Sequence, residues 1–204
     1  MNDSTIRSTT QLEALFGAVG DASIRKEVSF VHPHYRALIE ASPFAVLATA
    51  GPDGLDASPR GDAPGFVQVD GDSTLLLPER RGNNRIDSLR NILHDPRVAL
   101  LFLIPGVGET LRVNGRAEIT ADPAVLARFE VQGKLPQCVI VISVDTVFFQ
   151  CARAIQRSGL WQPPAADARS RVPSPGAILQ ALTGDVDGDK YDRELPARQQ
   201  GTLY

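Results

Sequence analysis

The stretch LLLPERRGNNRIDSLR (residues 75–90) predicts an apolar strand, a polar turn and a helix that begins near Ile86. The turn holds three arginines and two carboxamides, namely Arg80, Arg81, Arg85, Asn83 and Asn84. Guanidinium groups beside the free backbone N–H groups of a helix start are donors well suited to a phosphate. A solvated strand-to-helix turn has the same composition, so the stretch alone leaves an anion site and a plain surface turn as alternatives.

The composition is that of an ordinary globular protein with one domain and tails. Of its 204 residues, 43% are hydrophobic and 22% are charged, and the net charge is −3. A chain of this length can bury a sizeable core. Because there is no overall basic field, nucleic acid is not expected to be a main partner.

The sequence favours a cytoplasmic protein without a metal site. Its longest strongly apolar run, residues 98–105, is too short to span a bilayer, and the N-terminus lacks the apolar stretch of a signal peptide. Cys138 and Cys151 form no CxxC pair, so neither a disulfide framework nor a zinc knuckle is expected. The histidines do not match a metal-ligand pattern.

The first 43 residues are predicted to form a helical extension. Thr10 is expected to cap a helix over residues 11–17. Pro33 suits the first position of a second helix, which is expected to end at Ala41. Neither helix carries recognisable chemistry.

From Phe44 onward the pattern predicts consecutive strands. One hairpin is expected from residues 44–50 and 55–62, and a second from residues 65–71 and 73–79. Strands that follow one another in this way favour an antiparallel meander or barrel, which is a mainly β fold with flanking helices.

The second half of the predicted sheet follows the helix of the opening stretch. Ile86, Leu89, Ile92 and Leu93 are expected on the buried side of that helix. Strands are then predicted at residues 97–106 and 110–120, and one long or two short strands at residues 137–151.

Residues 162–204 are predicted to be an extended arm rich in proline and aspartate, with one brief helix near residues 178–182. Asp185, Asp187 and Asp189 suggest an EF-hand loop. Pro196 stands where such a loop needs its twelfth-position glutamate, so calcium is not expected.

No nucleophile elbow, zinc-protease motif, Walker loop or dinucleotide fingerprint stands in a suitable context, so no catalytic residue is identified. Ser58 has no histidine placed by the sequence to activate it. If the strand that ends near Arg60 lies beside the strand at residues 73–79, Arg60 can share an anion with the turn at residues 80–85. The alternative is a surface Arg60 that pairs with Asp62.

The order of these elements resembles the flavin-binding split-barrel family typified by pyridoxamine 5′-phosphate oxidase, in particular its smaller members. The resemblance rests on the run from residue 75 to residue 120, which includes DPRVALLF (residues 95–102) and VNGRAE (residues 113–118). It covers roughly residues 44–150. It implies a six-stranded antiparallel split β-barrel over residues 44–161, a homodimer, and FMN bound in two clefts between the subunits.

The resemblance also implies nine cofactor-binding residues: Ser58, Arg60, Pro78, Glu79, Asn83, Asn84, Arg85, Ser88 and Thr110. Arg60 matches the arginine that reaches the FMN phosphate. Asn84 and Arg85 match the basic pair in the turn, whereas Arg80 and Arg81 rank behind them because one or both are expected to face solvent.

The remaining matches concern the flavin ring and the partner subunit. Pro78 and Glu79 stand at the positions whose residues contact the isoalloxazine ring in members of that family. Ser88 is expected to replace part of a basic contact, because the helix is about one turn longer than in the oxidase. Thr110 matches a polar residue that reaches the site from the partner subunit.

One departure from the family concerns the substrate. The oxidase's C-terminal arginine-x-histidine segment has no match, because no histidine follows His94. Oxidation of pyridoxamine phosphate is therefore not expected. Lys134, Arg153 and Trp161 are candidates for a substrate pocket, with a surface charge or, for Trp161, a dimer-interface anchor as the alternative.

The predicted function is that of an FMN-dependent oxidoreductase acting on a small organic substrate. The flavin carries the hydride chemistry, so the sequence needs no catalytic acid or base. One alternative is a non-enzymatic flavin or haem carrier or sensor on the same barrel, with His32, His34 or His94 as a haem ligand. Another is a dimeric interaction module without a cofactor.

Overall fold

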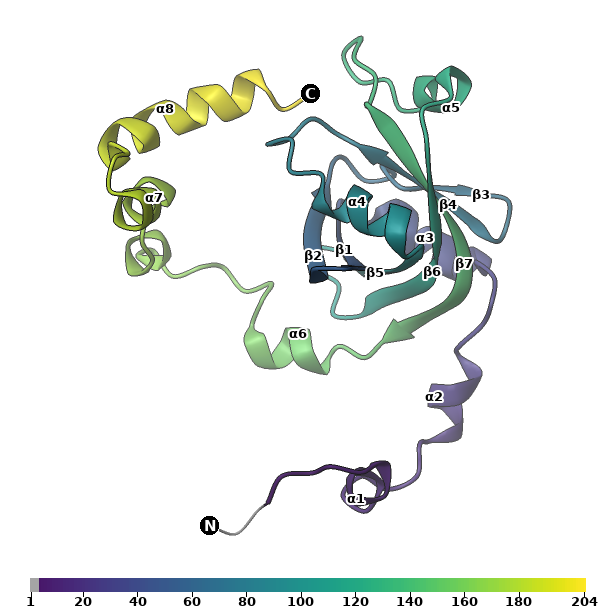
Figure 1. Cartoon of the computed structure of the whole chain (residues 1–204). Coiled ribbons are helices and arrows are strands. Elements are labelled where there is room, and N and C mark those ends of the chain that lie inside the picture. The colour runs from purple at the N-terminus through teal and green to yellow at the C-terminus, as the bar shows by residue number, and fades with distance from the viewer. Residues whose placement is uncertain (1–3) are drawn as a thin grey trace.

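The computed structural model describes residues 4–204, which form one seven-stranded antiparallel sheet with helices around it (Figure 1). The strands lie in the order β2-β1-β5-β6-β7-β4-β3. Their bounds are β1 Phe44–Gly51, β2 Gly54–Gly61, β3 Gln68–Asp70, β4 Thr74–Glu79, β5 Arg97–Leu103, β6 Thr110–Thr120 and β7 Cys138–Gln150. The prediction of a mainly β antiparallel fold is confirmed.

Helices precede, interrupt and follow the strands along the chain. Their bounds are α1 Thr9–Glu13, α2 Asp21–Arg25, α3 Pro33–Ala41, α4 Asp87–His94, α5 Pro123–Ala127, α6 Arg153–Ser158, α7 Pro175–Thr183 and α8 Gly188–Gly201, with a 3-10 turn at Ala168–Arg171. No helix within residues 4–204 combines the length and the apolar character needed to cross a bilayer.

The strand count of six is wrong, because the described chain has seven strands. The short edge strand β3 pairs with β4 over three residues, from Gln68 opposite Leu76 to Asp70 opposite Thr74. Gly71 allows this tight hairpin, since its φ of 68° lies in the left-handed region that favours glycine.

The sheet curls, and a bulge between Asn114 and Gly115 marks where β6 changes register against β7. A Cβ at Gly115 would stand 2.2 Å from the Ser143 carbonyl oxygen, so only glycine fits this close approach. The curl brings the end of β2 near the end of β4, where an ion pair joins Arg60 to Glu79. Side chains, rather than a ladder of backbone hydrogen bonds, thus connect these two strands.

The interior of the curled sheet is apolar. Leu47 of β1, Leu77 of β4 and Ile140 of β7 are all fully buried. Along β6 the inward residues Leu111 and Val113 alternate with outward polar ones, as the period-two pattern predicts. Burial of one such side chain contributes about 1.5–3 kcal/mol, so the sheet is held mainly by its core.

Helix α4 packs on β1 through polar contacts as well as apolar ones. Ser88 and Ile92 are buried, whereas Ile86 is 42% exposed and Leu93 is 77% exposed. The predicted buried stripe is therefore wrong at Ile86 and Leu93. The reason is that Asn91 turns toward the sheet and donates from Nδ2 to Thr49 Oγ1 at 3.0 Å.

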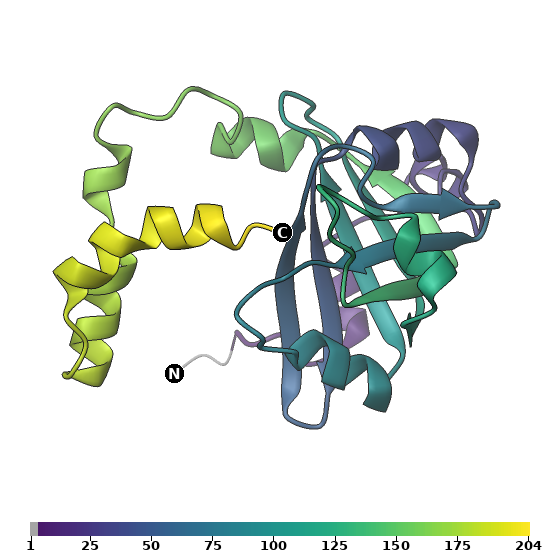
Figure 2. The same cartoon turned by 90° about the horizontal axis from the view of Figure 1, so that it is seen from above.

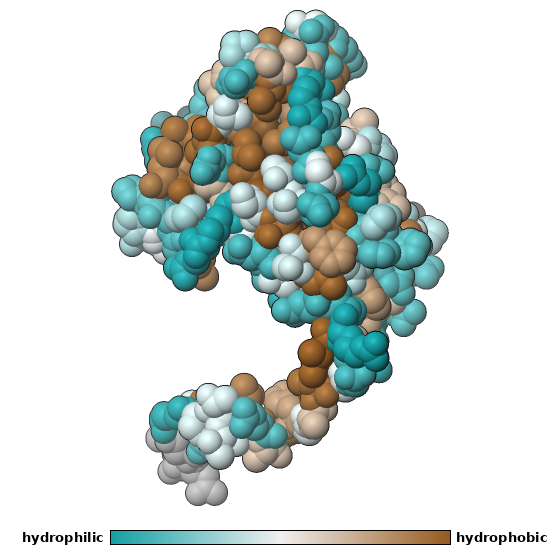
Figure 3. Space-filling model, turned by 90° about the vertical axis from the view of Figure 1, so that its right-hand side faces the viewer, coloured by the Kyte–Doolittle hydropathy of each residue, from teal (hydrophilic) through white to brown (hydrophobic). Residues whose placement is uncertain are grey.

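The N-terminal segment projects from the body of the molecule and carries apolar surface (Figure 3). Leu15 and Phe16 are each 66% exposed there. The helix predicted over residues 11–17 is shorter and earlier than expected, since α1 spans Thr9–Glu13. Ser8, not Thr10, caps it by accepting a hydrogen bond from the Gln11 N–H.

The C-terminal arm, residues 162–204, is largely helical, so the prediction of an extended arm with one brief helix is wrong. Ser174 caps α7, and Asp187 caps α8. The two helices meet at Gly176, where a Cβ would stand 2.1 Å from the Gly188 carbonyl oxygen. Pro196 lies inside α8 without ending it. Composition predicted an extended arm because it does not report these helix caps or this close contact between helices.

Figure 2 shows the α7–α8 pair standing away from the sheet, with the last residues returning to it. The arm meets the sheet through Tyr204, whose hydroxyl donates to Asp62 Oδ1 at 2.7 Å. The segment after β2 and the end of the chain are therefore neighbours in space.

Candidate functional site

A cleft of about 450 Å³ lies where the ends of β2 and β4 meet the turn that precedes α4. We call it the arginine cleft. Seven of the nine predicted cofactor-binding residues line it: Ser58, Arg60, Pro78, Glu79, Asn83, Asn84 and Arg85. Ser58 and Arg60 come from β2 and Pro78 and Glu79 from β4, so the curl of the sheet, not the local sequence, brings the two groups together.

The arginine cleft is positively charged. Among the described residues that line it, four are arginines, Arg60, Arg80, Arg81 and Arg85, and one is a carboxylate, Glu79. Arg60 pairs with Glu79, and the two side chains are 13% and 20% exposed. The alternative that Arg60 pairs with Asp62 is therefore wrong.

Arg60 keeps one donor without a partner. Its Nε is buried and makes no hydrogen bond within residues 4–204. An unsatisfied buried donor costs about 1–3 kcal/mol, which an acceptor oxygen would relieve. An anion bound in the cleft would supply such an oxygen.

The turn adopts a conformation that exposes its donors. Asn84 has a φ of 60°, a left-handed geometry that asparagine tolerates. Asn83 Oδ1 accepts from the Arg85 N–H at 3.0 Å and so shapes the turn. The Arg85 side chain is 77% exposed and pairs with Asp87. An exposed ion pair of this kind contributes little, so Arg85 can exchange Asp87 for a bound anion.

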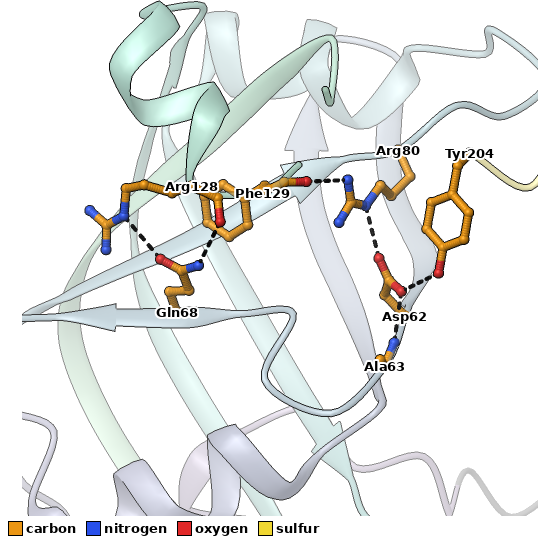
Figure 4. Close-up of polar contacts among 7 residues, drawn as sticks. All are labelled: Asp62, Ala63, Gln68, Arg80, Arg128, Phe129 and Tyr204. Carbon is orange, nitrogen blue, oxygen red and sulfur yellow. Dashed lines mark hydrogen bonds and ion pairs between the residues drawn. The ribbon is translucent and has the colours of Figure 1, made fainter. Parts of the chain in front are cut away.

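Arg80 is held in a polar network between strands and arm (Figure 4). Its Nε donates to Asp62 Oδ2 at 2.8 Å, and its Nη1 donates to the Phe129 carbonyl oxygen at 2.7 Å. The ring of Tyr204 lies 5.5 Å from the Arg80 Cζ. Arg80 is 17% exposed, so it lies against the sheet and does not face solvent.

The network shifts the titration of two of its members. Burial acts to raise the pKa of Asp62, but the hydrogen bonds from Tyr204, from the Ala63 N–H and from Arg80, together with the Arg80 charge, outweigh it, so the pKa is lowered. The hydrogen bond to Asp62, and secondarily burial, raises the pKa of Tyr204. Asp62 is thus held as a carboxylate and Tyr204 as a phenol at neutral pH.

Two predicted residues lie outside the arginine cleft of the same chain. Ser88 donates from Oγ to the Asp56 carboxylate beneath α4. Thr110 donates to Gln150 Oε1 at 3.3 Å, at the end of β7 opposite to Cys138. Since β7 has 13 residues, its two ends lie roughly 40 Å apart along the strand.

The three substrate candidates separate into two places. Lys134 lines a second cleft of about 360 Å³, next to the first, together with Arg80, Arg81 and Tyr204. Trp161 donates from Nε1 to the Val107 carbonyl oxygen at 2.7 Å, and Arg153 opens α6 at the same end of the molecule. Figure 1 places α6 at the end of the sheet away from the C-terminus.

The three histidines do not reach the arginine cleft. His32 Nδ1 accepts from the His34 N–H at 3.2 Å at the start of α3. His94 lies at the end of α4 and lines a different pocket, which Asp53 also lines. Within residues 4–204 no group of three or more histidine, cysteine or acidic side chains is placed to hold a metal ion.

Residues that the sequence did not predict as cofactor-binding complete the site. Phe66 and Gln137 line the arginine cleft, and Asp62 and Tyr204 hold Arg80. Asp62 and Tyr204 are 142 residues apart in the chain, and no sequence pattern predicts their contact. Of these two residues, only Asp62 lies close in sequence to a predicted site residue, because it follows Arg60 by two positions just after β2.

A family model described as pyridoxamine 5′-phosphate oxidase matches residues 31–151, which is more than half of the chain. A search of curated proteins found no match.

Solved structures with a similar arrangement come from several bacteria. HupZ of Group A Streptococcus is 21% identical, with 59% of this chain and 94% of that chain covered and a TM-score of 0.49. General stress protein 26 of Bacillus anthracis is 21% identical, with 55% and 88% covered and a TM-score of 0.42. An FMN-binding protein from Syntrophomonas wolfei is 14% identical, with 56% and 82% covered and a TM-score of 0.44.

Proposed function

Because this chain belongs to the pyridoxamine 5′-phosphate oxidase family, we propose that its arginine cleft binds FMN and that the protein is an FMN-dependent oxidoreductase. The observation that carries the proposal is the convergence of β2, β4 and the arginine-rich turn on one cleft, where the buried Nε of Arg60 lacks an acceptor.

The residues present fit a phosphate. A phosphate dianion would accept from Arg60 Nε and, in a bidentate manner, from Arg85. The carboxamides of Asn83 and Asn84 add neutral donors beside the guanidiniums. Glu79 limits how far the anion can enter, because it already pairs with Arg60 and would repel a second negative charge.

The apolar part of the cleft lining suits a flat ring. Pro78, Phe66 and Ile86 give it apolar surface. A bound flavin would supply the hydride chemistry. This chain's own residues would bind and orient the ring and exclude water from one of its faces, which is consistent with the lack of a recognisable catalytic acid or base.

The proposal includes a homodimer. Thr110 lies far from the arginine cleft of its own chain, so it could contact the cofactor only if a second copy brought it there. The exposed apolar surface near the N-terminus is available for such an association. Sedimentation analysis should therefore give twice the 22.0 kDa mass of the chain.

The direct test is the absorption spectrum of the purified protein, before and after incubation with FMN and desalting. Bound flavin should give its visible bands. Protein that remains colourless after both steps would exclude the proposal, and a Soret band would point to the haem carrier instead.

Arg85→Ala should weaken FMN binding by about tenfold to a hundredfold, since a hydrogen bond to a charged group contributes about 1.5–3 kcal/mol. Arg90→Ala is the matched control. Arg90 also pairs with Asp87 and is 67% exposed, but it does not line the arginine cleft. Equal flavin retention in the two variants would contradict the placement of the phosphate.

Turnover separates an enzyme from a carrier. The flavin-loaded protein should be reduced by a nicotinamide cofactor or another donor and then reoxidised by an acceptor over many cycles. A flavin that binds tightly but does not cycle with any donor would favour the carrier.

A further inference from the structure

Tyr204, at the end of the C-terminal arm, contacts three separate segments beside the sheet. Its hydroxyl donates to Asp62 Oδ1 at 2.7 Å, and its ring lies 5.5 Å from the Arg80 Cζ (Figure 4). Its main-chain oxygen accepts from Lys134 Nζ at 2.8 Å. We call these three contacts the Tyr204 anchor. Asp62 follows β2 and Arg80 follows β4, so the anchor fastens the arm to the edge of the sheet where the arginine cleft opens.

The Tyr204 anchor is the main attachment of the arm to the sheet. Helices α7 and α8 pack against each other rather than against a strand, and they stand away from the sheet (Figure 2). Their buried residues are Gly176 and Gly188, where the two helices meet. Two partly exposed hydrogen bonds and one ring contact are a weak attachment for an arm of this length. The arm can therefore be released without unfolding the sheet.

Arg80 links the Tyr204 anchor to the arginine cleft. Asp62 accepts from the Tyr204 hydroxyl and from Arg80 Nε, so the two side chains share one carboxylate. Arg80 also lines the arginine cleft, and the turn over residues 81–86 begins directly after it. The residues of this turn are exposed and belong to no helix or strand, so their position depends on what fixes the two ends of the turn.

The end of the arm also faces this turn. A hollow of about 600 Å³ lies between them, and its lining residues are Arg81, Gly82 and Asn83 of the turn and Arg198, Gln199, Thr202 and Leu203 of the arm. The three turn residues line the arginine cleft as well, so the turn borders both the cleft and the arm. A docked arm therefore limits the space into which the turn can move.

We propose that the Tyr204 anchor gates the arginine cleft. The docked arm holds Arg80 and the turn in place, and a ligand of the cleft enters and leaves when the arm is released. This deepens the proposed function, because it names how FMN exchange at that site is controlled, and it rests on that function only for the identity of the ligand. A gate changes the rates of entry and exit together, whereas a residue that contacts the ligand changes mainly the rate of exit.

The first experiment measures access to the cleft without flavin. Phenylglyoxal modifies accessible guanidinium groups, and peptide mass spectrometry gives the rate for each arginine. Tyr204→Ala should accelerate modification of both Arg80 and Arg60 by about tenfold, although Arg60 pairs with Glu79 and not with the arm. The rate at Arg90, which does not line the cleft, should stay the same. Faster modification of Arg80 alone would overturn the proposal, because Tyr204 would then merely cover that side chain.

The second experiment follows FMN exchange by stopped-flow fluorescence. No residue of the arm lines the arginine cleft in the described chain, so loss of the anchor should leave the FMN contacts in place. Tyr204→Ala should raise the association and dissociation rate constants by about tenfold each and change the Kd by less than about threefold. Leu182→Ala, on the exposed part of α7, is the control and should change neither rate constant. An unchanged association rate constant in Tyr204→Ala would overturn the proposal, as would a faster dissociation that weakens the Kd to the same extent.

The two experiments separate the gate from the flavin site. If FMN does not bind but Tyr204→Ala still accelerates modification of Arg60, the proposed flavin function fails and the gate stands. If FMN binds and exchanges at the same rates in Tyr204→Ala and in the unaltered protein, the gate fails and the flavin site stands. Tyr204→Phe keeps the ring and removes only the hydroxyl, so it should accelerate FMN exchange by about threefold.

Discussion

The sheet and the C-terminal arm are stabilised in different ways. The sheet buries apolar side chains from β1, β4, β5, β6 and β7 in a common core. In the arm, by contrast, the buried residues of α7 and α8 are Gly176 and Gly188, where the two helices meet. The arm reaches the sheet through polar contacts of Tyr204. A binding site whose walls come from both regions can therefore be altered at the arm while the sheet stays folded.

The largest expected effect comes from the core of the sheet. Leu47→Ala should lower the free energy of unfolding by about 3 kcal/mol, because Leu47 is fully buried and the substitution leaves a cavity. Denaturant unfolding measures it. The matched substitution in the arm, Leu182→Ala, should cost less than about 0.5 kcal/mol, since Leu182 is 79% exposed. Similar costs at the two positions would contradict the distinction between the regions.

The next effect is confined to the arm. Gly176→Ala places a Cβ 2.1 Å from the Gly188 carbonyl oxygen, so α7 and α8 must separate. The substitution should lower the stability of this helix pair by about 2 kcal/mol. Hydrogen exchange should accelerate in residues 175–201 and stay unchanged in the strands. Gly201→Ala is the control, because nothing lies within 4 Å of its Cβ position. Faster exchange throughout the sheet would mean that the two regions unfold together.

A smaller effect is expected where the arm touches the sheet. Tyr204→Phe keeps the ring against Arg80 but removes the hydrogen bond to Asp62, so proteolytic cleavage of the arm should accelerate about fivefold. Tyr191→Phe is the control within α8, since the Tyr191 hydroxyl makes no hydrogen bond in the part of the chain that the structure describes. Equal cleavage rates in the two variants would show that this hydrogen bond does not hold the arm.

The smallest effect is the response of arm docking to pH. The pKa of Asp62 is lowered from 3.8 when the arm is docked. The Asp62 carboxylate therefore stabilises arm docking fully above pH 3.8, and this stabilisation is lost as the pH falls through the folded-state pKa. The pKa of Tyr204 is raised from 10.0. The Tyr204 phenol therefore stabilises arm docking fully below pH 10.0, and this stabilisation is lost as the pH rises through the folded-state pKa. Docking should thus be constant from about pH 5 to pH 9.

Carbon-13 NMR of labelled tyrosine can follow the Tyr204 phenol directly. It should titrate above 10.0 in the native protein. In Asp62→Asn it should return toward 10.0, because the first cause of the shift, the hydrogen bond to the carboxylate, is lost. A Tyr204 titration that Asp62→Asn leaves unchanged would contradict the contact between arm and sheet.

Local patterns predicted most of the sheet. The strand predicted over residues 110–120 matched β6, and the helix predicted from Pro33 to Ala41 matched α3. These signals work because strand period, proline geometry and turn residues act over a few neighbouring positions. They predicted α4 but not its buried face, because Asn91 packs on Thr49. They failed for the arm, where two glycines let α7 meet α8.

The sequence by itself determined that strands and an arginine-rich turn follow one another in an order shared with a known family. It also placed Arg60 and Arg85 among the candidates for an anion, because guanidinium chemistry is a property of the residue type. The tertiary structure decided which charges are compensated. Asp62 forms an ion pair with Arg80, and Glu79 forms one with Arg60, whereas Arg81 has no ion-pair partner in the described chain. Such pairings depend on the curl of the sheet and the return of the arm, which join residues far apart in sequence and leave no local pattern.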